Sequence, residues 1–240
     1  WGEDGIIQFL LRHVPVARPL FVEFGVQNFT EANTRFLLTN NNWSGLIMDG
    51  SESDIDYVRR DPIYWRYNLK AVRAFVTREN INQLLRDNGV EGEIGLLSID
   101  IDGNDYWVWE QITVVTPAIV VVEYNARFGA ERAVTVPYAA DFERTRAHHS
   151  NIYYGASLAA LVALGRRKGY AFVGTNSAGN NAFFVRADLR PETLPEQTPS
   201  HGYTASQFRE TRDENGRLTF ASPQEEAAIL HSLPLVEVPQ

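Results

Sequence analysis

Short apolar runs alternate with segments of helical periodicity along the first 125 residues of this chain. Each run has the length of a buried strand, and each is followed by apolar residues at helical spacing. Strands that alternate with helices predict an α/β fold with a doubly wound, mostly parallel, Rossmann-like sheet. Two later runs on either side of an Asn/Gly turn predict an antiparallel closing hairpin. The expected helices are 5–14, 33–38, 54–60, 79–88, 106–112, 157–168 and 223–232, and the expected strands are 20–25, 45–50, 72–76, 94–100, 118–124, 169–174 and 181–185.

Acidic residues stand at the ends of several of these predicted strands. The apolar run 96–99 stops at Asp100, and Asp102 and Asp105 follow closely around Gly103. The other strand-end acids are Glu23, Asp49 and Glu123. In open α/β sheets, ligands bind outside the carboxyl ends of the strands. The sequence therefore predicts a carboxylate-rich site at that edge of the sheet.

Composition limits what such a site binds. The net charge of −8 argues against a nucleic-acid partner, because phosphate binding needs a basic surface. The chain has no cysteine, which excludes disulfides, zinc–thiolate sites and thiol nucleophiles. No stretch approaches the ~20 apolar residues of a membrane span, so no membrane partner is expected. We expect a cytoplasmic protein that acts on a small molecule, with homo-oligomerisation left open.

Gly25 and Asp49 have the spacing of a nucleoside site. An acid about 20 residues after a strand-end glycine is where dinucleotide-binding folds hold ribose hydroxyls. No further glycine occurs between Gly25 and Gly45, so the cradle that a pyrophosphate needs is absent. A nucleoside ligand without a pyrophosphate fits this pattern better. The alternative is that Gly25 and Gly50 only close tight turns.

The order of these motifs resembles that of class I S-adenosylmethionine-dependent methyltransferases, most closely the FkbM-like group. The segment 99–105, Ile-Asp-Ile-Asp-Gly-Asn-Asp, resembles that group's Ile-Asp-x-Glu-Gly-x-Glu pattern, with Asp in place of both Glu residues. The segments 22–25 and 46–51 resemble the family's first and second motifs, and 1–5 resembles a helix that precedes its core. The resemblance covers roughly residues 1–186.

This resemblance implies a set of cofactor-binding residues. Glu23 and Gly25 should border the methionine part of S-adenosylmethionine, and Asp100 its amino group or the reacting centre. The N–H groups at the start of the first core helix suit the cofactor carboxylate. The remaining implied contacts are Asn33 and Thr34 at that helix start, Asp49 and Gly50 at the ribose, and Thr77 and Asn80 near the adenine.

A divalent metal ion is a further expectation. Oxygen ligands suit Mg²⁺ or Ca²⁺, and some O-methyltransferases hold such an ion against the acceptor hydroxyls. The alternative is that these groups bind the cofactor and helix N-termini without metal. The expected ligands, from two strands predicted to be adjacent, are Asp100, Asp102, Glu123 and Asn125.

The segment 126–156 is a long insertion, and loops of that length are often functional. It carries His148 and His149, either of which could act as general base, although both could equally be exposed loop residues. We expect a methyltransferase domain over 1–187 that includes this insertion, with a tail, 188–240, packed on it.

The expected reaction is O-methylation of a small molecule, a sugar or glycosylated natural product by resemblance. Two other classes stay open. One is a metal-dependent hydrolase or transferase that uses Asp100 and Asp102, and the other is a non-catalytic nucleoside-binding module.

Overall fold

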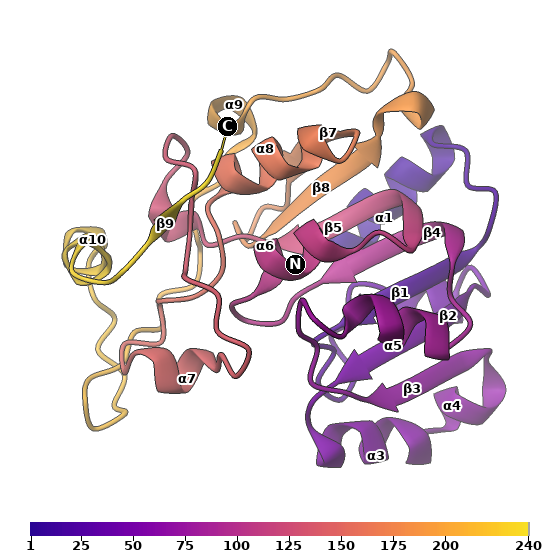
Figure 1. Cartoon of the computed structure of the whole chain (residues 1–240), viewed down its shortest axis with the longest axis horizontal. Coiled ribbons are helices and arrows are strands. Elements are labelled where there is room, and N and C mark those ends of the chain that lie inside the picture. Colours follow the sequence, from indigo (N-terminus) through magenta and orange to yellow (C-terminus); the bar gives the residue numbers. More distant parts are fainter. Residues whose placement is uncertain (240) are drawn as a thin grey trace.

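The computed structural model describes residues 1–239, so the last residue of the predicted tail lies outside it. Seven strands form one sheet in the order β3-β2-β1-β4-β5-β8-β7 (Figure 1). The first five are parallel, and β8 is antiparallel to both β5 and β7. The predicted α/β sheet with an antiparallel closing hairpin is therefore confirmed. The strands are β1 (Leu20–Phe24), β2 (Ser44–Asp49), β3 (Leu69–Arg73), β4 (Gly92–Ile99), β5 (Val115–Glu123), β7 (Tyr170–Thr175) and β8 (Asn181–Arg186).

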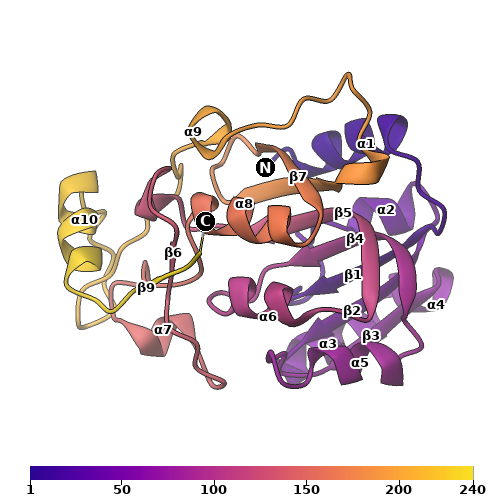
Figure 2. The same cartoon turned by 45° about the horizontal axis from the view of Figure 1, so that its top comes forward.

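Helices cover both faces of the sheet (Figures 1 and 2). Every residue of β1 is buried, which explains why its sequence is an almost unbroken apolar run. One face packs against α1 (Glu3–His13), α2 (Arg35–Thr39), α3 (Glu52–Arg60) and α4 (Pro62–Arg66). The other face packs against α5 (Ile81–Asp87), α6 (Asp105–Gln111) and α8 (Leu158–Arg167).

The strand order reverses between β1 and β4. From β1 the chain continues outward through β2 and β3, and then returns to place β4 and β5 on the other side of β1. At such a reversal the helices diverge to opposite faces and leave a crevice outside the carboxyl ends of the two strands. The end of β1 and the end of β4 therefore mark the expected ligand site.

Polar side chains form a row across this end of the sheet. Glu23 and Ser98 are register partners on β1 and β4, and Glu123 and Asn181 are register partners on β5 and β8. Ser98 pairs with Val121, two residues before Glu123, and side chains two residues apart share a face. All four side chains thus lie on the face that α1 and α2 cover.

The insertion and the tail pack together. Both views show α7, α10 and β9 on one side of the sheet (Figures 1 and 2). β9 pairs antiparallel with β6, and Leu230 of α10 joins an apolar cluster with Val136 and Ile152. The division at 187/188 stays a prediction. The elements of the two segments are η1 (Ala126–Phe128), β6 (Val134–Thr135), α7 (Arg144–Ala147), η2 (Ala187–Leu189), α9 (Pro199–Gly202), α10 (Pro223–His231) and β9 (Val236–Glu237).

Two local features differ from the sequence predictions. The third strand begins at Leu69, not at 72, because β3 is an edge strand whose exposed Lys70 and Arg73 interrupt the apolar run. Helix α4 was not predicted, although Asp61 caps it by accepting a hydrogen bond from the Ile63 N–H (2.8 Å). Apolar residues of the insertion, Val136, Ile152 and Tyr153, are buried against Leu230 of the tail. None of the helices within residues 1–239 is long and apolar enough to cross a membrane.

Candidate functional site

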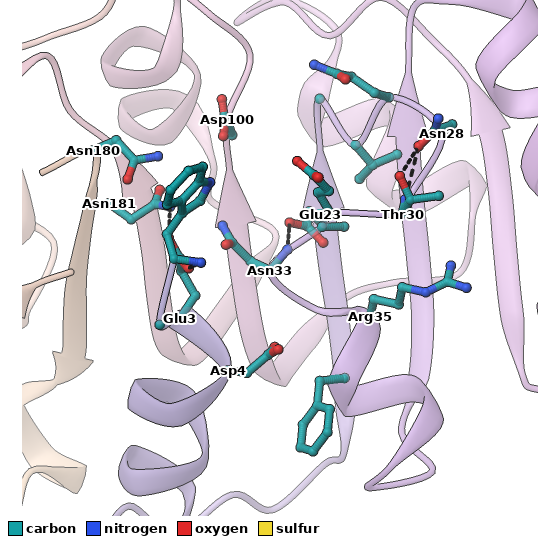
Figure 3. A pocket seen from close by; sticks show the side chains of 18 of the residues that line it. Glu3, Asp4, Glu23, Asn28, Thr30, Asn33, Arg35, Asp100, Asn180 and Asn181 are labelled. Atoms are coloured by element: carbon teal, nitrogen blue, oxygen red, sulfur yellow. Dashed lines mark hydrogen bonds and ion pairs between the residues drawn. The ribbon is translucent and has the colours of Figure 1, made fainter. Parts of the chain in front are cut away.

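A cavity of about 820 Å³ opens at the reversal of the strand order. Binding pockets for small molecules have volumes of this order. Its walls come from the start of α1, the loop after β1, helix α2, the residue that follows β4 and the turn before β8 (Figure 3). Sequence segments far apart in the chain thus meet where the strand topology predicts a ligand.

Gly25 is required where it stands. Its φ is +72°, a value that side-chain-bearing residues rarely adopt, and a Cβ at this position would lie 1.5 Å from the carbonyl oxygen of Asp100. The β1 loop can therefore lie against the end of β4 only because residue 25 has no side chain. Gly50 differs, because its φ is not in the left-handed region and the nearest atom to a Cβ there would be Phe75 Cδ2 at 3.1 Å.

Glu23 holds the backbone just before α2 in place beside the cavity. Its carboxylate accepts hydrogen bonds from the N–H groups of Asn33 (2.9 Å) and Thr34 (3.1 Å), and from the hydroxyls of Thr34 and Ser98. Burial raises the pKa of Glu23, and these hydrogen bonds oppose the rise. The prediction that the two N–H groups are free for a cofactor carboxylate is wrong, because Glu23 already occupies them. Asn33 still lines the cavity, whereas Thr34 is fully buried.

The predicted ribose and adenine residues lie beside the cavity rather than in its wall. Asp49 accepts hydrogen bonds from the N–H groups of Gln27 (2.8 Å) and Ser51 (2.8 Å), so it ties the β1 loop to the end of β2. Thr77 and Asn80 exchange hydrogen bonds in the loop before α5. Asp49 does not line the cavity itself, but Gln27, to which it is hydrogen-bonded, does. Its oxygens keep lone pairs for a ribose hydroxyl, and that role stays a prediction.

Acidic side chains dominate the cavity wall. Arg35 is the cationic side chain among the lining residues, and it donates a hydrogen bond to the Phe29 carbonyl (3.1 Å). Sequence reasoning missed Arg35, and it missed Asn180 and Asn181, which reach the cavity by the β7–β8 turn (Figure 3). The local sequence offered no signal for them. The acids of the wall are Glu3, Asp4, Glu23, Glu31 and Asp100.

Asp100 is the acid best placed for chemistry. Its side chain lies between Asn181 and Glu23 and points into the cavity (Figure 3). Among residues 1–239, no protein group donates a hydrogen bond to its carboxylate. Burial, followed by the charge of Asp102, raises the pKa of Asp100 well above its usual value. A carboxyl with these properties is available to a ligand rather than to the fold.

Asp105 supports the loop that carries the other acids. It begins α6, is fully buried, and accepts hydrogen bonds from the N–H groups of Ile101 (2.8 Å) and Gly103 (3.0 Å). Burial raises its pKa from 3.8 to about 6, although these hydrogen bonds lower it. Asp105 is therefore a residue that fixes the shape of segment 100–105.

The Asp105→Asn variant tests this assignment through the pH dependence of stability. The pKa of Asp105 is raised in the folded state, so its contribution to stability is full below pH 3.8 and is lost as the pH rises through about 6. The loss amounts to about 3 kcal/mol. Asparagine does not titrate, so we expect the melting temperature of the variant to fall less than that of the wild type between pH 4 and 6.5. Parallel curves for the two proteins would contradict the assignment.

The predicted metal ligands do not come together as a metal site. Within residues 1–239, no group of three or more His, Cys, Asp or Glu side chains is arranged to hold an ion. Asn125 instead donates hydrogen bonds to the carbonyls of Ile152 (2.9 Å) and Tyr154 (3.0 Å), and Asp102 forms an ion pair with Arg144 (2.7 Å). The predicted set fails because the insertion supplies partners to two of its four members.

The two histidines of the insertion lie outside the cavity wall. His149 is exposed, and Nδ1 of His148 accepts a hydrogen bond from the Ser150 N–H (3.2 Å). Burial lowers the pKa of His148, and the neighbouring His149 lowers it further. Neither histidine lines the cavity, and a role for either as general base stays a prediction.

Solved structures similar to this chain include several methyltransferases. One is a S-adenosylmethionine-dependent methyltransferase from Clostridium acetobutylicum, with 6% identity over 76% of this chain and 89% of that one and a TM-score of 0.47. An O-methyltransferase from Bacillus cereus in complex with SAH has 14% identity over 76% and 78% of the chains and a TM-score of 0.46. The N-terminal domain of EvdMO1 with SAH bound has 12% identity over 76% and 79% and a TM-score of 0.46. No family model and no curated protein matches the sequence. Likenesses at this level do not by themselves assign the chain to a family.

Proposed function

We propose that this chain is an S-adenosylmethionine-dependent methyltransferase of the FkbM-like group that methylates a hydroxyl of a small polyhydroxylated acceptor, such as a sugar or a glycosylated natural product. The observation that carries the proposal is the acid-lined cavity at the reversal of strand order, with Asp100 unpartnered inside it. The acceptor class follows from the sequence resemblance of segment 99–105 alone.

The charge of the cavity favours this cofactor over a nucleotide. Five of its lining side chains are acidic and one is Arg35. Acidic walls repel phosphates, whereas they attract the sulfonium and ammonium groups of S-adenosylmethionine. The chain also lacks the glycine-rich cradle of a pyrophosphate site. A cationic nucleoside therefore fits the residues present better than a dinucleotide.

The residues of the cavity divide between the two ends of the cofactor. Gly25 lets the β1 loop lie beside the ligand, and Asp49, through the Gln27 N–H, holds that loop at the ribose end. Arg35 replaces the helix N–H groups as the partner of the cofactor carboxylate. Asp100 accepts either the cofactor ammonium or the proton of the acceptor hydroxyl.

When bound, S-adenosylmethionine supplies a methyl group that its sulfonium charge activates. The chain's own contribution is to hold the acceptor hydroxyl in line with that group, which is a large part of the barrier reduction in such reactions. Asn180 and Asn181 stand opposite Glu23 across the cavity (Figure 3). Asn181 Nδ2 donates a hydrogen bond to Glu3 (3.1 Å), and Asn180 Oδ1 accepts one from Asn176, so the Asn180 Nδ2 group is the amide donor left for a hydroxylated acceptor.

Substitution of Arg35 tests the cofactor carboxylate contact. In an Arg35→Met variant we expect the affinity for S-adenosylmethionine to fall about 10- to 100-fold, since a hydrogen-bonded charge pair contributes about 1.5–3 kcal/mol. Isothermal titration of variant and wild type measures this loss. Adenosine lacks the carboxylate, so its affinity should change little. An equal loss for both ligands would mean that Arg35 only supports the loop at Phe29.

Transfer of a radiolabelled methyl group tests the reaction itself. We expect label in hydroxylated acceptors such as sugars and glycosides, and none in amine or thiol analogues of the same compounds. Label in the amines alone would overturn O-methylation. Cofactor binding with no label in any acceptor would instead favour the non-catalytic nucleoside-binding module.

A further inference from the structure

Four acidic residues lie in the segment after β4 and at the end of β5. Asp100, Asp102, Asp105 and Glu123 act on one another through their charges. Glu123 is 7% exposed, and its Oε2 atom is buried without a hydrogen-bond partner among residues 1–239. A cation nearby stabilises the ionised forms of buried carboxylates whose charges act on one another. We call these four residues the acid cluster.

Arg144 of the insertion brings a cation to the acid cluster. Its Nη1 forms an ion pair with Asp102 Oδ1 (2.7 Å), and its Nε donates a hydrogen bond to the Asn151 carbonyl (2.8 Å). The guanidinium carbon lies 3.8 Å from the ring centroid of Tyr154. An ion pair, a backbone hydrogen bond and a stacking contact together hold the guanidinium in one position.

The charge of Arg144 reaches beyond its direct partner. It also stabilises the ionised forms of Asp100 and Glu123, which makes it the cation shared by three of the four acids. Its side chain is 25% exposed, and no Nη2 hydrogen bond is made within the described chain. One edge of the guanidinium therefore has no hydrogen-bond partner within the described chain.

We propose that Arg144 is a built-in cation that takes the place of a divalent metal ion in the acid cluster, and that its open N–H edge binds an oxygen of the acceptor. The first part stands without the proposed methyl transfer, and the second rests on it. The metal set predicted from sequence fails because the insertion carries its own positive charge into the cluster. The site then works without metal, and Arg144 is a positioning residue for the acceptor.

Titration with Mn²⁺, followed by electron paramagnetic resonance of the free ion, tests the first part on the full chain. We expect the wild type to bind no Mn²⁺ at the acid cluster. In Arg144→Met, Asp102 loses the partner that holds it and a repulsive unit charge is removed, so we expect one Mn²⁺ site with an affinity at least about tenfold above any binding by the wild type. Arg146→Met is the matched control: Arg146 is two residues away, mostly exposed and paired with Glu143, so its loss should create no site. Adding Asp102→Asn to Arg144→Met should abolish the gained site.

Two results would overturn the proposal. One is a wild-type Mn²⁺ site that Asp102→Asn removes, and the other is a folded Arg144→Met variant that gains no site. If Arg144→Met does not fold by circular dichroism, Arg144→Lys keeps the charge without the planar fork, and the wild-type titration with its Asp102→Asn comparison still decides. Neither readout needs S-adenosylmethionine or an acceptor, so failure here is distinguishable from failure of the proposed methyl transfer.

The second part is tested by acceptor kinetics. In Arg144→Lys we expect KM for the acceptor to rise at least about fivefold while cofactor affinity stays unchanged, since the flexible ammonium of lysine does not reproduce the planar guanidinium. Added Mg²⁺ should not restore it. An unchanged KM, or activity that depends on Mg²⁺ in the wild type, would overturn this part.

Discussion

A Gly25→Ala variant is expected to lose cofactor binding and to melt well below the wild type. Alanine at φ +72° costs about 1–2 kcal/mol, and its Cβ would stand 1.5 Å from the Asp100 carbonyl oxygen. The neighbouring atom is backbone, so the β1 loop must move away from β4. We expect a total loss of about 3 kcal/mol or more, equivalent to about 6–12 °C in melting temperature for a chain of this length. Displacement of the loop by an ångström should also lower turnover about 100-fold.

Two other glycines separate the causes of this loss. Gly89 has φ +75° and open space around a Cβ, so Gly89→Ala measures the conformational cost alone. Gly50 closes the next strand end without a left-handed φ and does not line the cavity, and the exposed Phe75 side chain that a Cβ would meet can shift, so Gly50→Ala should have a small effect on both stability and binding. The experiment consists of thermal melts and cofactor titrations of the three variants. If Gly25→Ala behaved like Gly89→Ala, the close approach of the β1 loop to β4 would not matter for the site.

An Asp100→Asn variant is expected to bind S-adenosylmethionine about 10- to 100-fold more weakly, because a hydrogen bond to a charged group contributes about 1.5–3 kcal/mol. S-adenosylhomocysteine keeps the ammonium group and lacks the sulfonium charge. If Asp100 holds the ammonium, both ligands should lose affinity equally. If Asp100 faces the reacting centre, turnover should fall much further than the affinity for either ligand.

The pH dependence of binding gives this prediction a second readout. The pKa of Asp100 is raised well above its usual value, first by burial, and the cationic ligand binds the ionised form. Affinity of the wild type for S-adenosylmethionine should therefore rise as the pH rises through that pKa, and Asp100→Asn should remove this rise. Asp56→Asn is the control, because it also removes one negative charge, but Asp56 pairs with Arg59 and Arg60 on α3 and does not line the cavity. Equal affinities and turnover in Asp100→Asn and wild type would contradict the assigned role of Asp100.

The strands and their acidic ends were predictable because parallel strands buried on both faces must be apolar until they leave the sheet. Glu23, Asp49 and Asp100 stand at the ends of such strands. Glu23 and Asp100 line the cavity at the reversal of strand order, and Asp49 is hydrogen-bonded to Gln27, which also lines it. The hairpin was predictable from its Asn/Gly turn. The start of the edge strand β3 was predicted three residues too late, because exposed Lys70 and Arg73 interrupt its apolar run.

The partners of the acids were not predictable. The sequence shows that Glu23 ends a strand, but not that it takes the N–H groups of Asn33 and Thr34. It shows four oxygen ligands near one edge, but not that Arg144, 42 residues after Asp102, pairs with one of them. Such contacts depend on how distant segments of the chain pack together, and no local sequence pattern predicts that packing.

Isothermal titration of the full chain with S-adenosylmethionine, S-adenosylhomocysteine and NAD tests the central claim most directly. The acid-lined cavity predicts one site per chain for S-adenosylmethionine, weaker binding of the uncharged-sulfur S-adenosylhomocysteine, and no binding of the pyrophosphate-bearing NAD. A chain that binds NAD, or that binds neither sulfur nucleoside at millimolar concentration, would contradict it.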